Sequence, residues 1–303
     1  MLKSFCLRFE AQESTGEYLS GHDAPAYEAL QSKCEEEHGS AFRALPQPVP
    51  QESIDVWLTF ADETFSASLL DEYGRLMTED ERAREARYIF ERDRRRHRIT
   101  RALVRTVLSR YAPVSPEHWS FTQNEYGRPE IAGSDLPANL PFFNVSHAAG
   151  LIAMAVGPQP SVGIDTEDFR ARRAPLEVAD RFFSPRERAA LDSCPLDTRD
   201  ELFFEYWTLK ESYIKARGMG LSIPIHRFGF EFPNPREIAV VFSEEIADSP
   251  DRWRFWQFRP RENYVVAVCA QLASTGRENP VIRKSVPLVS EQTMDCSIRR
   301  QSA

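Results

Sequence analysis

The chain lacks the features that would place it in a membrane or on a secretory route. Nowhere in its 303 residues are there the roughly 18 consecutive apolar residues that a membrane-spanning helix needs. Near its start the only apolar run is the short Phe5-Cys6-Leu7, which is no apolar core of a signal peptide. The sequence therefore predicts a protein without a membrane partner.

Cysteine is also scarce, and negative charge outweighs positive charge. The five cysteines are odd in number and scattered, and no pair has the spacing of zinc ligands. A disulfide framework is not expected in a chain of this size, so a reduced, cytoplasmic setting fits best. The net charge of −8 argues against a chain devoted to coating nucleic acid, and we expect no nucleic-acid partner.

Both ends of the chain are weakly patterned. Residues 1–53 are interpreted as an N-terminal extension, helical in part around 24–36 and closed by a proline-rich linker at 46–50. Residues 274–303 lack periodicity and are predicted to be a disordered C-terminal tail. We expect neither end to hold the functional site.

The residues between the two ends show clear strand and helix signals. Residues 54–60 are rich in β-branched and aromatic side chains and predict a strand. Thr78 and Glu81 have the spacing of a capping box, which opens a helical stretch that runs through Tyr88 and, after Asp93, on to Tyr111. A second helix is predicted over about 200–217, and Gly218 is its expected left-handed cap.

The order helix, aromatic strand, turn and apolar hairpin occurs twice along this region. It predicts an α+β fold of two pseudo-symmetric α+β halves, 54–160 and 161–273. A chain with two such internal halves is expected to be a monomer. The active site should lie at their interface, where both halves contribute residues.

The segment Gly163-Ile164-Asp165-Thr166-Glu167 places two carboxylates two positions apart. In a strand Asp165 and Glu167 point to the same side, and Mg²⁺ favours a few such carboxylates together with water and phosphate oxygens. Taken alone, the pattern is equally that of an exposed polar strand end beside a turn.

The predicted helix over 201–215 adds to this segment. Most of it is apolar, yet Lys210, Glu211 and Lys215 interrupt the apolar surface, which is costly unless these residues have partners. Glu211 and Lys215 could simply form a surface ion pair at i, i+4 spacing. The aromatic density around them favours a site, in which carboxylates hold a divalent ion against a pyrophosphate and a lysine neutralises the charge that moves.

The first half supplies positive charge. The stretch 81–110 is rich in arginine, and arginine side chains match phosphate oxygens in a bidentate manner. A solvated helix face is the alternative for any one of them. Ser146 and His147 are neighbours in a predicted strand and face opposite ways, so they do not form a nucleophile–base dyad; a phosphate contact is more reasonable, and a structural histidine is the alternative.

Five motifs in order, spread over 54–272, resemble those of the Sfp-type 4′-phosphopantetheinyl transferases. They are Tyr126-Gly127-Arg128-Pro129, Phe143-Asn144-Val145-Ser146-His147, Gly163-Ile164-Asp165-Thr166-Glu167, Arg181-Phe182-Phe183-Ser184-Pro185-Arg186-Glu187 and Trp207-Thr208-Leu209-Lys210-Glu211-Ser212-Tyr213-Ile214-Lys215. The resemblance implies two pseudo-symmetric halves with coenzyme A at their interface. It also implies transfer of 4′-phosphopantetheine from coenzyme A to a serine of an apo acyl or peptidyl carrier protein, as in a holo-[acyl-carrier-protein] synthase.

Carried over position by position, the resemblance implies that Asp165, Glu167 and Glu211 bind Mg²⁺. Glu211 would accept the serine proton, and Lys215 would contact the pyrophosphate and stabilise the leaving group. The rest of coenzyme A, its 3′-phosphate and adenine, would contact five residues: Arg84, His97, Arg128, Ser146 and His147. Two rival classes remain, a nucleic-acid-binding module that uses the arginines and a coenzyme A-binding protein without turnover.

Overall fold

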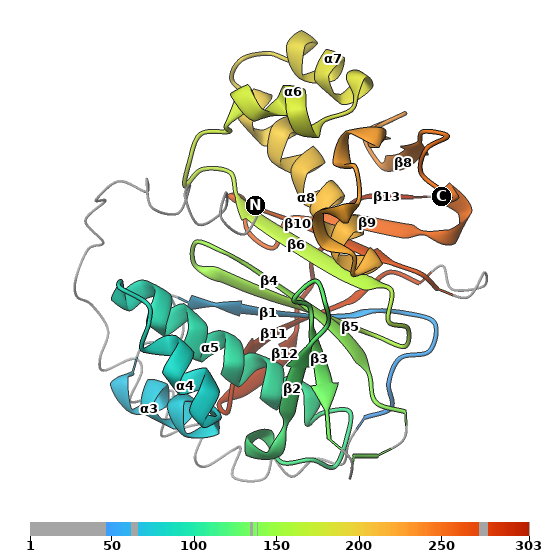
Figure 1. Ribbon diagram of the computed structural model, residues 1–303. Helices are drawn as coiled ribbons and strands as arrows, with labels where there is room; N and C mark the ends of the chain where they lie inside the picture. The colour runs from blue at the N-terminus through green and yellow to red at the C-terminus, as the bar shows by residue number, and fades with distance from the viewer. Residues whose placement is uncertain (1–46, 62–65, 134–135, 138, 273–277, 303) are drawn as a thin grey trace.

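The computed structural model describes residues 47–61, 66–133, 136–137, 139–272 and 278–302. It contains two larger sheets packed face to face, with helices on the outer side of each (Figure 1). The predicted α+β fold with two sheet-containing halves is confirmed. The predicted helix around 24–36 lies outside the described residues.

The first sheet has the strand order β12-β11-β1-β5-β4. Its strands are β1 (Asp55–Phe60), β4 (Phe142–Ala148), β5 (Leu151–Gly157), β11 (Val281–Val286) and β12 (Ser290–Thr293). A separate hairpin, β2 (Ser120–Gln123) with β3 (Pro129–Ala132), lies beside this sheet. The helices of this part are α3 (Ala67–Leu76), α4 (Glu79–Glu85) and α5 (Glu91–Leu108).

The second sheet has the strand order β6-β10-β9-β13-β8-β7. Its strands are β6 (Val162–Asp168), β7 (Phe228–Glu231), β8 (Glu237–Phe242), β9 (Arg254–Phe258), β10 (Tyr264–Ala270) and β13 (Ile298–Ser302). The accompanying helices are α6 (Ala179–Phe182), α7 (Pro185–Ser193) and α8 (Arg199–Arg217).

Alternation along the strands creates the layers. In β1, Val56 and Leu58 enter the core between the two sheets, whereas Trp57 enters the core that α5 covers. In β10, Val268 belongs to the core between the sheets and Val265 to the core under α8. Because successive strand side chains point to opposite faces, one apolar strand can serve two cores.

The predicted helix boundaries hold where capping chemistry sets them. Thr78 and Glu81 form the capping box that opens α4, and α8 ends at Gly218, whose φ of 65° is left-handed. The predicted interruption between Tyr88 and Asp93 is present, although its bounds differ by a few residues: α4 ends at Glu85 and α5 begins at Glu91.

The prediction of a disordered tail after residue 273 is wrong over 278–302. Strand β11 pairs with β1 in the first sheet, and β13 lies between β9 and β8 in the second. The tail therefore joins both sheets. Its Arg300 is buried by pairing: the guanidinium lies 2.8 Å from the Glu205 carboxylate of α8 and donates to Gln257 of β9.

At one side of this sheet packing the edge strands β4 and β6 lie side by side, and we call the line between them the seam. They are the outermost strands of the two sheets and lie close together without forming a ladder. Side chains bridge them instead: the Asn144 amide oxygen accepts from the Ile164 backbone N–H at 3.0 Å. The seam therefore leaves room for side-chain chemistry between the two halves.

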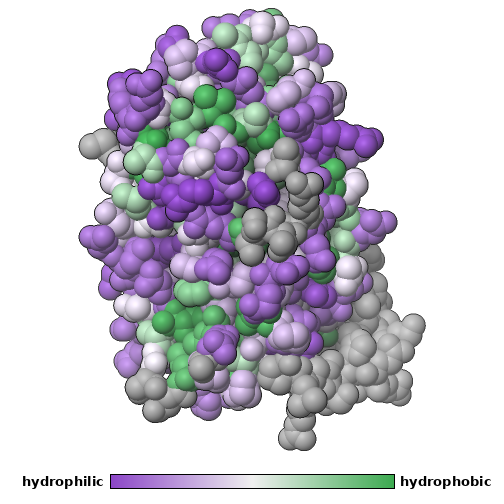
Figure 2. Space-filling view, turned by 90° about the vertical axis from the view of Figure 1, so that its right-hand side faces the viewer, coloured by the Kyte–Doolittle hydropathy of each residue, from purple (hydrophilic) through white to green (hydrophobic). Residues whose placement is uncertain are grey.

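No helix among the described residues is long and apolar enough to cross a membrane. The face of the molecule shown in Figure 2 is mostly hydrophilic, and its apolar residues gather in separate patches above and below a polar middle.

Candidate active site

The seam brings together three of the predicted site residues. The Lys215 ammonium of α8 lies 2.6 Å from Asp165 Oδ1 of β6 and donates to Ser146 Oγ of β4 at 2.8 Å. Ser146 in turn donates to the same Asp165 oxygen at 2.8 Å. A triangle of lysine, aspartate and serine therefore spans both halves.

Helix α8 can reach β6 because residue 163 is glycine. A Cβ at Gly163 would lie 2.1 Å from the Ser212 carbonyl oxygen and 2.5 Å from the Ala216 nitrogen, far closer than any real contact. The helix therefore rests directly on the strand backbone. This close contact places Glu211 and Lys215 beside Asp165 and Glu167.

The carboxylates beside the triangle influence one another. Burial, followed by the charge of Asp165, raises the pKa of Glu211 to about 7. Burial also raises the pKa of Glu167 to about 7, and Asp165 adds to the effect, although Arg172 lies 3.0 Å from Glu167 and opposes it. Three acidic side chains thus share a poorly solvated space.

This acidic set fits a divalent cation in its chemistry. Asp165 Oδ2 and Glu211 Oε1 are buried, and neither has a hydrogen-bond partner among the described residues. Such orphaned carboxylate oxygens are costly unless a cation or proton compensates them. The described residues contain no group of three or more His, Cys, Asp or Glu side chains arranged to hold a metal, and Lys215 and Arg172 each engage one of the carboxylates.

A positive region faces the acidic one across the seam. His147 keeps an exposed surface. The loss of solvation inside the protein, and then the positive charges of Arg96 and Lys215, hold the pKa of its imidazole below the ordinary value. Burial also lowers the pKa of His97 to about 4, with Arg101 and Arg84 adding to the effect. An anion placed among these side chains would relieve their mutual repulsion.

The sequence singles out Arg84, which is exposed on α4, and includes Arg96 and Arg101 of α5 only as members of the arginine-rich stretch. The charges of both affect His147. Arg101 also lies 3.5 Å from the Glu81 carboxylate. In the sequence, Arg101 lies four residues after His97, and this spacing indicates that both side chains are on the same face of a helix.

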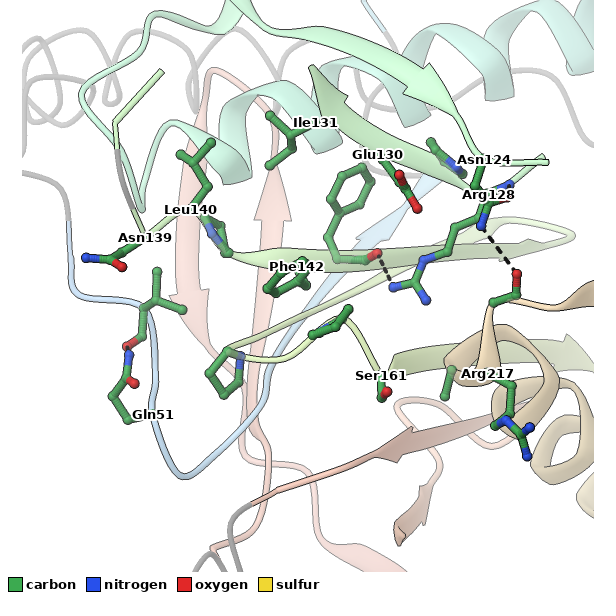
Figure 3. Close-up of a pocket in the computed structure, with 18 of the residues that line it drawn as sticks. Gln51, Asn124, Arg128, Glu130, Ile131, Asn139, Leu140, Phe142, Ser161 and Arg217 are labelled. Atoms are coloured by element: carbon green, nitrogen blue, oxygen red, sulfur yellow. Dashed lines mark hydrogen bonds between the residues drawn. The ribbon is translucent and has the colours of Figure 1, made fainter. Parts of the chain in front are cut away.

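Arg128 lies elsewhere along the seam, at the C-terminal end of α8. It lines a pocket of about 980 Å³ between the β2–β3 hairpin, the segment before β4 and the end of α8 (Figure 3). Asp165, Glu211 and Lys215 are not among the residues that line this pocket. Burial lowers the pKa of Arg128, and Glu130 opposes that effect.

Lys210, which the sequence also placed among the unusual charges of α8, does not face the seam. Its ammonium is fully buried, 2.9 Å from the equally buried Glu187 carboxylate, and donates to the carbonyl oxygens of Ile225 and Phe228. Glu187 accepts from the Ser184 and Phe230 backbone N–H groups as well. This pair holds α7, α8 and β7 together.

Family models match both halves of the chain. The model described as "4′-phosphopantetheinyl transferase superfamily" matches residues 161–269. The model described as "4′-phosphopantetheinyl transferase, N-terminal" matches residues 66–159. The first matched region contains the carboxylates and Lys215, and the second contains His97, Arg128, Ser146 and His147.

Curated relatives agree with the family models. The 4′-phosphopantetheinyl transferase HetI of Nostoc is 34% identical over 230 residues, which cover 74% of this chain and 92% of HetI. The 4′-phosphopantetheinyl transferase Sfp of Bacillus subtilis strain 168 is 30% identical over 217 residues, 72% of this chain and 92% of Sfp. With both halves matched and nearly the full length of these relatives covered, the chain belongs to the 4′-phosphopantetheinyl transferase family.

Proposed function

We propose that this protein transfers the 4′-phosphopantetheine group of coenzyme A to a serine of an apo acyl or peptidyl carrier protein. The products are the holo carrier and adenosine 3′,5′-bisphosphate, as made by a holo-[acyl-carrier-protein] synthase. The observation that carries this proposal is the seam, where Lys215 and a set of buried carboxylates from one half face the histidines and arginines of the other. A pyrophosphate and its counter-charges would fit between two such regions.

Magnesium is part of the proposal. Asp165, Glu167 and Glu211 would hold Mg²⁺, and the unpartnered oxygens of Asp165 and Glu211 support this assignment. When bound, the ion would neutralise charge on the pyrophosphate oxygens. Because Lys215 contacts Asp165 at 2.6 Å, we expect this lysine to move from the aspartate to the pyrophosphate when coenzyme A and the ion enter.

The reacting groups have defined roles in the proposed step. Glu211 accepts the proton of the carrier serine, for which its pKa of about 7 is suited. The serine oxygen forms a bond to the β-phosphorus of coenzyme A, and the bond from that phosphorus to the bridging oxygen breaks. Lys215 stabilises the charge that appears on the departing adenosine bisphosphate.

The remaining predicted contacts stay proposals for the adenosine end of coenzyme A. His97, His147 and Arg84 belong to or border the positive region, and its arginines add charge that suits a 3′-phosphate. Ser146 is buried in the triangle and would contact the ligand from β4. Arg128 would border the adenine side through its turn, while its guanidinium lines the pocket beside the C-terminal end of α8.

We further propose a cytoplasmic monomer that uses neither nucleic acid nor a membrane as its partner. Its division into halves at 54–160 and 161–273, with the extension 1–53 before them, also stays a proposal. The 274–303 segment would act as part of both halves, because its strands belong to both sheets.

Mass spectrometry of apo carrier proteins incubated with the protein, coenzyme A and Mg²⁺ tests the function. We expect a mass gain of one phosphopantetheine group on the carrier, at its serine, and none when coenzyme A is omitted. Carriers of fatty-acid, polyketide and nonribosomal-peptide type, compared side by side, define the pathway. Coenzyme A binding without a mass gain on any carrier would instead favour the non-catalytic binder.

A further inference from the structure

The turn between β2 and β3 reaches across the seam to the helix that carries Glu211 and Lys215. Asn124 organises the turn, because its amide oxygen accepts from the backbone N–H groups of Tyr126 and Arg128, each at 3.0 Å. Gly127 has a φ of 84°, which an L side chain rarely adopts. The turn is therefore a rigid platform for the two side chains that leave it.

Those two side chains bind the C-terminal end of α8. Arg128 Nη1 donates to the Lys215 carbonyl oxygen at 3.1 Å, and Asn124 Nδ2 donates to the Gly218 carbonyl oxygen at 3.3 Å (Figure 3 shows the second bond). Carbonyl groups at a helix end lack partners within the helix, and a cation there also meets the negative end of the helix dipole. The turn thus caps a helix that belongs to the other half.

The same guanidinium also holds the two seam strands. Arg128 Nη2 donates to the carbonyl oxygens of Phe143 in β4 and Val162 in β6, both at 3.2 Å. One side chain therefore connects β4, β6 and α8, the three elements that carry Ser146, Asp165 and Lys215. The pocket-facing position of Arg128 does not by itself make it a ligand, because its donors are already directed at these carbonyl oxygens.

We propose that Asn124 and Arg128 are positioning residues that set the place of Lys215 and Glu211 against β6. Helix α8 packs directly against the Gly163 backbone. A shift of the helix end would therefore also displace β6 and Asp165. The Lys215 backbone is held by Arg128 while its ammonium binds Asp165 and Ser146. The Arg128 guanidinium thereby acts on the reaction through Lys215.

This inference rests on the proposed function for its kinetic test. In Arg128→Met we expect kcat of carrier modification to fall 10-fold or more, while the Kd of coenzyme A, measured by calorimetry without carrier, changes less than twofold. Asn124→Ala should lower kcat two- to fivefold. Arg128→Lys should recover part of the loss, because an ammonium keeps the charge but cannot serve three carbonyl oxygens in one plane. The matched control is Arg75→Met, which removes one exposed arginine of α3 far along the chain from the turn.

A rise in the Kd of coenzyme A with kcat unchanged would overturn the proposal and make Arg128 a ligand. A second readout does not need activity: amide hydrogen exchange at Gly218, whose N–H donates to Ile214 and Lys215, should be faster in Arg128→Met than in Arg75→Met. Unchanged exchange there would overturn the proposal as well. If the wild-type protein modifies no carrier, the proposed function fails, and the exchange result still decides whether the turn holds the helix.

Discussion

Helix α8 contributes its lysines to two lysine–carboxylate pairs, five residues apart, which differ in their exposure to solvent. We call Lys210 with Glu187 the sealed pair and Lys215 with Asp165 the open pair. Lys210 and Glu187 are both fully buried, and backbone groups complete their hydrogen bonding. Backbone N–H groups donate to the carboxylate, and carbonyl oxygens accept from the ammonium. Lys215 and Asp165 lie at the seam, where the lysine is 26% exposed and one aspartate oxygen has no hydrogen-bond partner among the described residues. A completed pair serves the fold, whereas an incomplete pair at an opening is suited to a ligand.

The largest effect is expected beside the open pair. Glu211→Gln keeps the shape of the side chain but removes the proton acceptor, so holo-carrier formation should fall by at least about 10³-fold. The folded state should persist, because the amide removes a charge from a crowded acidic set. Mass spectrometry of the carrier and a thermal unfolding curve measure the two properties, and near-normal turnover would sink the role given to Glu211.

The sealed pair should matter for stability instead. Lys210→Met leaves the Glu187 carboxylate buried without its cation, which should lower the free energy of unfolding by about 3–5 kcal/mol. Urea unfolding measures this loss, and Lys215→Met is the matched control, with a smaller loss of stability and a much larger loss of activity. The comparison fails if the two variants lose equal amounts of stability.

Substitution of each lysine by arginine compares the space available around the two pairs. At position 210 an arginine must fit a fully buried site, and overpacking of this kind costs about 1–3 kcal/mol. At position 215 the seam can accept the larger group, so Lys215→Arg should cost less than about 0.5 kcal/mol. Equal midpoints of urea unfolding for the two variants would contradict the difference in enclosure.

The smallest effect concerns pH. The pKa values of Glu167 and Glu211 are raised from 4.5 to about 7 in the folded protein, so between these values the folded state binds more protons than the unfolded state. Their contribution to stability is present below pH 4.5 and is lost as the pH rises through about 7. In metal-free protein we expect stability to fall from pH 5 to pH 8, and Glu211→Gln should flatten this slope. Urea unfolding at both pH values, with chelator present, measures it; a slope of the opposite sign in the wild type would refute the assignment.

Local signals in the sequence predict those parts of the molecule that local chemistry determines. The capping box at Thr78 and the end of α8 at Gly218 follow from a few neighbouring residues, and the alternation of β1 and β10 follows from their own side chains. The family resemblance predicts that the seam residues form one site. The structure then placed Ser146, Asp165 and Lys215 in contact.

Long-range pairing explains what the sequence did not reveal. The sequence predicts a disordered tail at β13 because its polar residues show no strand alternation. Arg300 becomes a buried residue only through Glu205, which lies far away in the chain. The partner of Lys210 is 23 positions away, at Glu187. Nothing near Arg128 in the sequence indicates that its donors will meet three carbonyl oxygens from distant elements.

The strands formed by residues 278–302 have a consequence for synthesis of the protein. Strand β1 emerges from the ribosome early, but its parallel neighbour β11 follows more than two hundred residues later, and β13 enters the second sheet later still. Neither sheet can be completed during translation until this segment has left the exit tunnel. Until then the edges of β1, β8 and β9 lack these neighbours and can pair with other chains. A nascent chain is therefore prone to aggregate until this segment emerges, and a chain truncated before it stays so.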